Sequence, residues 1–224
     1  MGLVREFCAE NMEHVPAAIA AGAARIELCD NLAKGGTSPS AGVVRAACAY
    51  GQEHGVDVMV MVRPRGGDFA YTADELAMMR DDIDVALDAG ATGVVFGCER
   101  DGHLDTAATQ VLLARVHERR DDAQVTFHMA FDKIRAGEQL AVIDWLAEHG
   151  VTRILTHGGP DGTAIADNVG RLREYVARAA GRIGILPGAG ITWENAEQIA
   201  SAVGVPEVHG TRIVRLAENE YWDM

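Results

Sequence analysis

The sequence has little positive charge and almost no lysine. Its 20 lysine and arginine residues are outnumbered by 33 acidic residues, which gives a formal net charge of −13, and only Lys34 and Lys133 are lysines. A surface of this sign repels phosphate backbones, so the composition argues against a nucleic-acid partner. No apolar run approaches the roughly 20 residues that a membrane-spanning helix needs, so we expect no membrane segment.

Cysteine is also scarce. The four cysteines, Cys8, Cys29, Cys48 and Cys98, form no CxxC pair and no disulfide framework, which is typical of reduced thiols in the cytoplasm. The N-terminus places an arginine and a glutamate within its first apolar stretch, unlike a secretory signal peptide. We therefore expect a cytoplasmic protein.

Linkers and low-complexity segments are missing as well. No GxGxxG motif follows the first predicted strand, which argues against a dinucleotide-binding sheet. A repeated pattern is present instead, in which a helix ends near a glycine and a short β-branched strand follows, as at 21–29, 88–97 and 147–156. Glycine suits the positive φ of a helix C-terminus, and repeated strand–helix units imply parallel strands.

Eight such strands can be read from the chain. They are predicted near 3–8, 24–29, 57–63, 93–97, 124–128, 152–156, 182–187 and 206–210. Thr72 and Glu75 form a capping box for the helix after the third strand. An open sheet and a closed barrel both fit eight units, but the even spacing of about 28 residues favours the barrel. We predict an α/β fold, a single (β/α)8 TIM barrel, with one domain over residues 1–224.

The first two strands end in similar triplets, Glu6-Phe7-Cys8 and Glu27-Leu28-Cys29. Side chains alternate along a strand, so each glutamate shares a face with its cysteine. A charged group facing inward must be paired or functional, which makes Glu27 a candidate site residue. The cysteines are either soft-metal ligands or small buried apolar residues, and Cys98 is expected at the same rim.

The third strand continues into the loop Arg63-Pro64-Arg65-Gly66-Gly67-Asp68-Phe69. Arginine recognises carboxylate or phosphate through paired N–H donors, and glycine lets backbone N–H groups approach a ligand. The loop is therefore a candidate substrate-binding segment. In the alternative interpretation, Arg63 or Arg65 pairs internally with Glu6 or Glu27.

The fifth predicted strand ends at His128, and Asp132 follows in the next loop. A histidine beside a carboxylate is suited to proton transfer, because the carboxylate fixes its tautomer. The alternative is a core histidine bonded to the backbone.

The last two strands end in Gly188-Ala189-Gly190 and His209-Gly210-Thr211-Arg212. TIM barrels often bind phosphate between these two loops, with N–H donors at a helix N-terminus. We predict an anion-binding site here, with Arg212 as an added contact.

Six blocks of the sequence form a distinctive set: ARIELCD (24–30), KGGTSPS (34–40), RPRGGDF (63–69), TFHMAFD (126–132), RILTHGG (153–159) and PGAGIT (187–192). Together they closely resemble the CutC copper homeostasis family. The resemblance covers nearly the whole chain and implies a cytosolic (β/α)8 barrel, a homo-oligomer (dimer or tetramer), and copper(I) bound by Cys8 and Cys29. Met129 stands where the family commonly has arginine, and His157 where it commonly has a small hydroxyl residue.

Two functional hypotheses follow. The first is a copper-handling protein that binds Cu(I). The second is an enzyme acting on a small anionic or phosphorylated substrate through an acid–base pair and an arginine anion site. It assigns catalysis to Glu27, His128 and Asp132, and substrate binding to Glu6, Arg63, Arg65, Asp68, Gly188, Gly190, His209 and Arg212.

Overall fold

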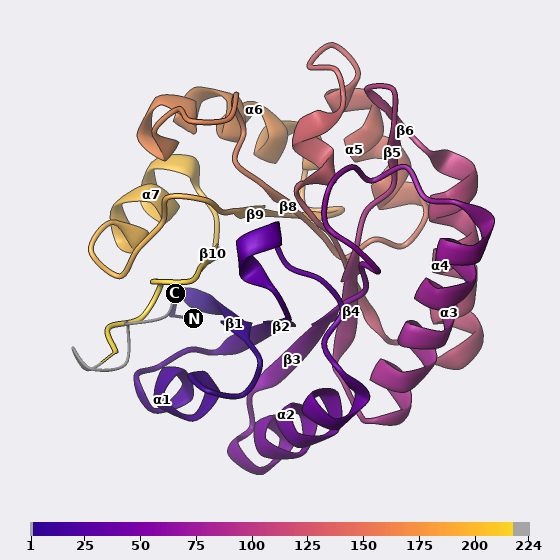
Figure 1. Cartoon of the computed structure of the whole chain (residues 1–224). Coiled ribbons are helices and arrows are strands. Elements are labelled where there is room, and N and C mark those ends of the chain that lie inside the picture. Colours follow the sequence, from indigo (N-terminus) through magenta and orange to yellow (C-terminus); the bar gives the residue numbers. More distant parts are fainter. Residues whose placement is uncertain (1, 217–224) are drawn as a thin grey trace.

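The computed structural model describes residues 2–216. Within them, eight parallel strands surround a central axis and seven α-helices cover the outside, which confirms the predicted (β/α)8 fold (Figure 1). The strands are β1 (Val4–Glu10), β2 (Arg25–Cys29), β3 (Asp57–Met61), β4 (Gly93–Phe96), β7 (Gln124–Phe127), β8 (Arg153–Thr156), β9 (Gly184–Pro187) and β10 (Glu207–Gly210). The helices are α1 (Val15–Ala20), α2 (Ala41–His54), α3 (Ala73–Asp88), α4 (Thr106–Arg119), α5 (Gln139–Glu148), α6 (Val169–Ala179) and α7 (Ala196–Val203). The predicted domain, 1–224, extends beyond the described part at both ends.

The sheet is a nearly closed barrel. Its strands follow the order β10-β1-β2-β3-β4-β7-β8-β9, and each neighbouring pair is parallel. Among residues 2–216, no hydrogen-bonded ladder joins β9 to β10. An isolated parallel bridge between Thr192 and Arg212 links the segments that follow these two strands. The barrel therefore has one seam, between β9 and β10.

Local signals explain where helices begin and end. The Thr72 side chain accepts a hydrogen bond from the Glu75 backbone, and Glu75 in turn accepts from the Thr72 backbone, which confirms the predicted capping box of α3. Gly22, Gly90 and Gly150 follow α1, α3 and α5 with φ of +97°, +87° and +81°. Such angles are costly for any residue with a Cβ, so the repeated helix–glycine–strand pattern has a direct conformational cause.

Alternation along the strands separates two layers. Outward-facing residues such as Phe7, Ile26 and Val94 pack with the helices in the main apolar core. Inward-facing residues of β1 to β4 form a second, sulfur-rich cluster inside the barrel: Cys8, Cys29, Met59, Met61 and Val95, against which Leu32 packs. TIM-barrel interiors are usually filled by branched apolar side chains. Thiols and thioethers in that position mark the interior near β1, β2 and β3 as specialised.

The structure contains a small hairpin that was not predicted from the sequence, and one cysteine lies elsewhere than expected. Strands β5 (Glu99–Arg100) and β6 (His103–Leu104) pair antiparallel around Asp101 and Gly102, both at positive φ. An Asp-Gly turn of this kind is a hairpin signal that was available in the sequence. The expectation that Cys98 lies at the rim with the other thiols is wrong, because Cys98 belongs to the outer apolar core.

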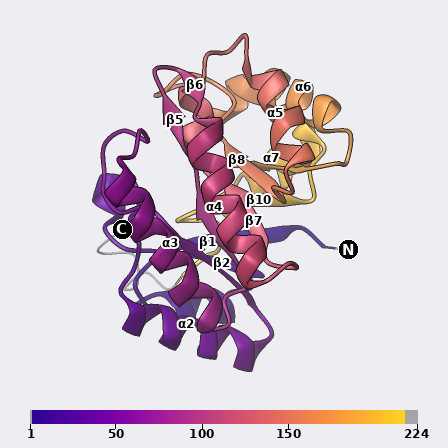
Figure 2. The ribbon, with the colours of Figure 1, turned by 90° about the vertical axis from the view of Figure 1, so that its right-hand side faces the viewer.

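The helices pack closely around the barrel. Figure 2 shows α3 and α4 running side by side along its outside. No helix among the described residues is both long enough and apolar enough to span a membrane.

Candidate functional site

A cavity of about 260 Å³ lies at the carboxyl ends of the barrel strands. This is the end at which TIM-barrel sites are built, because eight strand–helix loops converge there. The cavity is lined by Cys8, Glu27, Cys29, Leu32, Gly35, Met61, Arg63, Phe69, His128, Met129, Leu155, Ala189, Gly190, Ile191, His209, Gly210 and Thr211. Of the predicted site residues, it brings together Cys8, Glu27, Cys29, Arg63, His128, Gly190 and His209.

Two thiols and one carboxylate meet on the β1–β2 side of the cavity. The strand register places Cys8 opposite Glu27. The Glu27 Oε2 atom lies 3.2 Å from Cys8 Sγ and 3.6 Å from Cys29 Sγ, and all three residues are buried. The hydrogen-bonding contact with Cys29 and burial both raise the pKa of Cys8 well above its ordinary value. Hydrogen bonding with Cys8 lowers the pKa of Cys29, but burial and the charge of Glu27 outweigh it and raise that pKa to about 11.

His209 of β10 completes this cluster. Its Nδ1 atom is 2.8 Å from Glu6 Oε1, and its Nε2 atom is 3.7 Å from Glu27 Oε2. One ligand atom from each of Cys8, Glu27 and His209 lies within 4.8 Å of the other two, a spacing that a metal ion can bridge. Burial alone would lower the pKa of His209, but the charge of Glu27 and the hydrogen bonds to Cys8 and Glu6 raise it well above the ordinary value.

A buried ion-pair network holds His209 from the amino-terminal side of the barrel. Arg25 of β2 donates to Glu6 and also to Glu207, the latter at 2.6 Å. Burial alone would raise the pKa of Glu6, but the hydrogen bond with His209 and the charge of Arg25 lower it to about 2. Glu6, which does not line the cavity, is thus an anion that positions His209. Arg25 was missed as a site-supporting residue, although its alternation with Glu27 on one strand was a readable signal.

Arg63 is not paired with Glu6 or Glu27, so that alternative interpretation is wrong. Its guanidinium instead donates to four backbone carbonyls, those of Lys34, Gly35, Gly36 and Gly67, at 2.8–3.2 Å. Arg63 is 4 % exposed and ties the loop after β2 to the loop after β3. Gly35 and Gly36 have φ of +83° and +82°.

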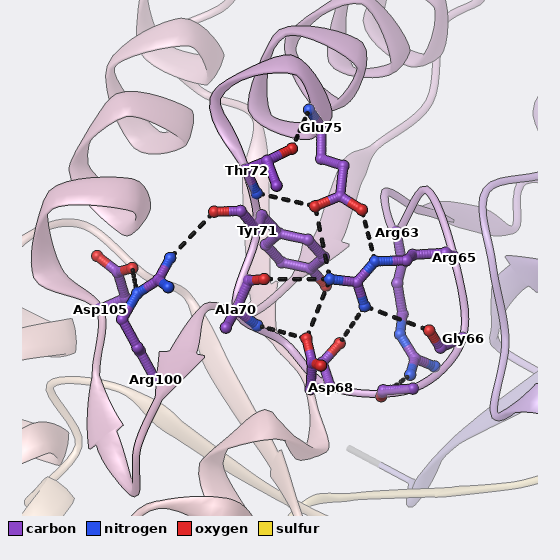
Figure 3. A network of polar contacts seen from close by, with 11 residues as sticks. Arg63, Arg65, Gly66, Asp68, Ala70, Tyr71, Thr72, Glu75, Arg100 and Asp105 are labelled. Atoms are coloured by element: carbon purple, nitrogen blue, oxygen red, sulfur yellow. Dashed lines mark hydrogen bonds and ion pairs between the residues drawn. The ribbon is translucent and has the colours of Figure 1, made fainter.

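Arg65 and Asp68 lie outside the cavity. Figure 3 shows the Arg65 guanidinium between the carboxylates of Asp68 and Glu75, with the Tyr71 ring beside it. Glu75 is the capping-box residue of α3, so Arg65 ties its loop to the start of that helix. Arg63 and Arg65 therefore serve different structural tasks, and only Arg63 reaches the cavity.

His128 and Asp132 are likewise separated by their hydrogen bonds. His128 Nδ1 accepts from the Ala130 backbone N–H at 3.2 Å, as in the alternative of a backbone-bonded core histidine. Burial and the nearby charge of Arg63 lower the pKa of His128 to about 3, so the ring is neutral. Asp132 accepts instead from the Thr156 hydroxyl and the His157 backbone, and burial raises its pKa. The carboxylate predicted to orient His128 is therefore bonded elsewhere.

The loops after β9 and β10 contribute unequally. Gly190 lines the cavity, whereas a Cβ on Gly188 would lie 2.5 Å from Leu155 Cδ1, so Gly188 is needed for close packing. The helix after this loop begins only at Ala196. Arg212 is exposed, and its carbonyl accepts from the Trp193 backbone. The predicted phosphate arrangement, with a helix N-terminus directly after Gly190, is therefore not formed.

A parallel (β/α)8 barrel with a cavity at the carboxyl ends of its strands defines a protein of the TIM-barrel class. The chain belongs to the CutC family, whose sequence pattern matches residues 3–214. It is 51 % identical to the CutC family protein of Enterococcus faecalis, covering 95 % of this chain and all of that one. It is 38 % identical to the human copper homeostasis protein cutC homolog, covering 93 % of this chain and 72 % of the human one.

Solved structures agree. A crystal structure of CutC from Streptococcus agalactiae superimposes with a TM-score of 0.90 at 42 % identity, covering 95 % of this chain and all of that one. Deoxyribose phosphate aldolase from Aeropyrum pernix gives a TM-score of 0.69 at 13 % identity, over 95 % and 86 % of the two chains. The second likeness shows the barrel fold alone.

Proposed function

We propose that this protein binds Cu(I) through Cys8 and Cys29, with Glu27 and His209 as neighbouring ligands. The observation that carries the proposal is the contact of both thiols with one carboxylate oxygen, at 3.2 and 3.6 Å, inside a cavity of about 260 Å³. Thiolates are the ligands that Cu(I) prefers, and a metal that binds a protonated thiol displaces its proton. The human relative is named as a copper homeostasis protein, which supports the same metal.

The surroundings of the two thiols favour a soft metal. Met59 and Met61 pack in the same cluster, and Met61 also lines the cavity. Thioether sulfur suits Cu(I) and adds no charge to the interior. Burial and local contacts raise the pKa values of both cysteines, which makes either thiol a poor nucleophile without a metal.

A competition titration tests the proposal. Reduced, oxygen-free protein is titrated with Cu(I) against a chromophoric chelator, alongside Cys8→Ser/Cys29→Ser and the matched control Cys48→Ser/Cys98→Ser. We expect Cu(I) binding by the wild type and the control, and at least a hundredfold weaker binding by the first variant, since both thiolates are lost. Equal affinity of the first variant and the wild type would exclude this site.

A second candidate function is catalysis on a small anionic substrate, with Glu27 and His128 exchanging protons and Arg63 near the anion. It is favoured by two buried atoms without a hydrogen-bond partner on the cavity residues, Glu27 Oε1 and His128 Nε2. Thermal-shift screening of a metabolite panel tests it. A stabilising ligand whose effect is lost in His128→Asn supports this function, and no stabilisation by any compound counts against it.

We also propose a cytoplasmic homo-oligomer. Four free, buried cysteines favour a reducing compartment. Met78 and Val85 of α3 and Val111 of α4 are exposed on neighbouring helices, which favours contact with another copy. Light scattering after size-exclusion chromatography tests the assembly, and a monomer at all concentrations would contradict it.

A further inference from the structure

Three cavity residues carry buried polar atoms that have no hydrogen-bond partner. The atoms are Glu27 Oε1, Arg63 Nε and His128 Nε2, and the three side chains are 2 %, 4 % and 4 % exposed. Buried polar groups in proteins are nearly always hydrogen-bonded, because an unpaired one loses its contact with water and gains nothing. All three atoms belong to residues that line one cavity, which favours a ligand that supplies the missing partners.

Arg63 also has no counter-charge among the described residues. Its two terminal nitrogens are occupied by backbone carbonyls, which satisfy hydrogen bonds but carry no net charge. Among residues 2–216, no carboxylate lies within ion-pair distance of Arg63. A buried cation without a partner is costly, and a bound anion would compensate it. Nε–H is the donor that Arg63 has left to offer.

His128 supplies a neutral donor beside this cation. Because Nδ1 accepts from the Ala130 N–H, the proton of the neutral ring lies on Nε2. The Phe69 ring, which also lines the cavity, lies 4.8 Å from the His128 ring and 4.7 Å from Arg63 Cζ. The His128 and Arg63 side chains therefore pack against one aromatic ring.

We propose that the cavity binds a small monocarboxylate whose oxygens accept from Arg63 Nε and His128 Nε2. One uncompensated positive charge matches one negative charge, whereas a phosphate dianion would leave a charge unpaired. The rest of the lining is largely apolar, including Leu32, Met61 and Leu155, which suits a short carbon chain. Glu27 Oε1 can then accept a hydrogen bond from a polar group on the ligand's carbon chain, such as a hydroxyl. The cavity volume, about 260 Å³, is below the usual range for drug-sized ligands, so the acid is small.

This inference rests on the second candidate function above, deepens it by naming the ligand class, and does not require copper. The test is isothermal titration calorimetry on reduced, chelator-treated full-length protein, with acetate, pyruvate, lactate and inorganic phosphate as probes. We expect saturable binding of at least one monocarboxylate and none of phosphate. Saturation by phosphate alone, or no monocarboxylate binding up to about 10 mM, overturns the proposal.

Two substitutions of His128 separate ligand contact from folding. His128→Asn keeps an acceptor for the Ala130 N–H but loses the outer donor, and we expect at least tenfold weaker carboxylate binding. His128→Gln places an amide N–H near the original Nε2 position, and we expect recovery to within about threefold of wild type. Equal carboxylate affinity of His128→Asn and wild type would overturn the assignment of His128 Nε2 as a donor to the ligand, whether or not His128→Gln also binds. The carboxylate titrations are run without copper and the Cu(I) titration without carboxylate, so the two proposals fail independently.

Discussion

Cys8 of β1 stands opposite Glu27 of β2 in the parallel register, and its Sγ atom lies 3.2 Å from Glu27 Oε2. Cys29, two residues further along β2, reaches the same oxygen at 3.6 Å. A one-residue slip between these strands would turn one partner out of the barrel, because side chains alternate. The pairing of β1 with β2 is therefore what brings both thiols to one carboxylate.

Arg25→Ala should strongly destabilise the protein. The substitution removes one of the two cationic partners of the buried Glu6 carboxylate, the other being His209, and losing one partner of a buried pair costs about 3–5 kcal/mol. Urea unfolding followed by circular dichroism measures the free energy. Arg5→Ala is the matched control, since Arg5 pairs with the exposed Glu197 and should cost about 1 kcal/mol or less. Similar costs for the two variants would contradict the inferred network.

His128 should make stability depend on pH. Its pKa is about 3 in the folded protein and 6.5 in its ordinary state, so below pH 6.5 the unfolded chain takes up a proton that the folded chain refuses. The free energy of unfolding therefore falls as the pH drops from 6.5 toward 3, by up to about 1.4 kcal/mol for each pH unit. At about pH 5 the loss approaches roughly 2 kcal/mol.

The control for this effect is His128→Asn, which cannot titrate. Urea unfolding of both proteins at several pH values gives the difference that belongs to His128. We expect the wild type to lose stability relative to the variant as the pH falls. A difference that stays constant from pH 7 to about 5 would refute the low pKa.

Gly97→Ala should displace the His128 ring from its position, because the added methyl group would overlap it. A Cβ at this position would lie 2.6 Å from His128 Nδ1 and 2.9 Å from the Ala130 Cβ, closer than packed atoms allow. We expect a loss of about 1–3 kcal/mol and weaker carboxylate binding. Gly137→Ala is the control, because nothing lies within 4 Å of its added Cβ, and it should change stability by about 0.5 kcal/mol or less. Unchanged melting temperature and ligand affinity in Gly97→Ala would argue against a fixed ring position.

Arg65→Ala should leave ligand binding intact. Arg65 contacts Asp68 and Glu75 outside the cavity, so its loss affects only the loop and the start of α3. Its side chain is 36 % exposed, so we expect a cost of about 1 kcal/mol or less. Thermal melting and calorimetry with a monocarboxylate measure both effects. A large drop in affinity would restore Arg65 as part of an anion-binding pair.

The fold could be predicted from the sequence because its signals are local. Thr72 and Glu75 mark a helix start within four residues, and Gly90 marks a helix end through its own backbone angle. The alternation of Glu27 and Cys29 on one strand likewise reveals which side chains share a face. None of these signals requires knowledge of distant parts of the chain.

The internal partners could not be predicted, because they depend on how the barrel closes. Glu6 meets His209 and Arg25 only after β10 and β2 have paired on either side of β1. Arg63 likewise donates to backbone carbonyls and not to a carboxylate, because the loop at 34–36 places its carbonyl groups against the guanidinium. Strand alternation predicts which face of the sheet a side chain lies on, but not which residue of another strand it contacts. The ion pairs therefore became visible only in the structure.

The seam between β9 and β10 gives this barrel two edges. The wall on one side carries Gly190 and Ile191, and the wall on the other carries His209 and Gly210, so the cavity spans the seam. Within residues 2–216, side-chain packing and the Thr192–Arg212 bridge hold these walls together, whereas every other neighbouring pair of strands shares a ladder. The amides of β9 and β10 that face this seam should therefore exchange faster than the amides within the strand ladders. A local opening along this seam would expose the cavity from its side, because Gly190 and His209 line it from the opposite walls.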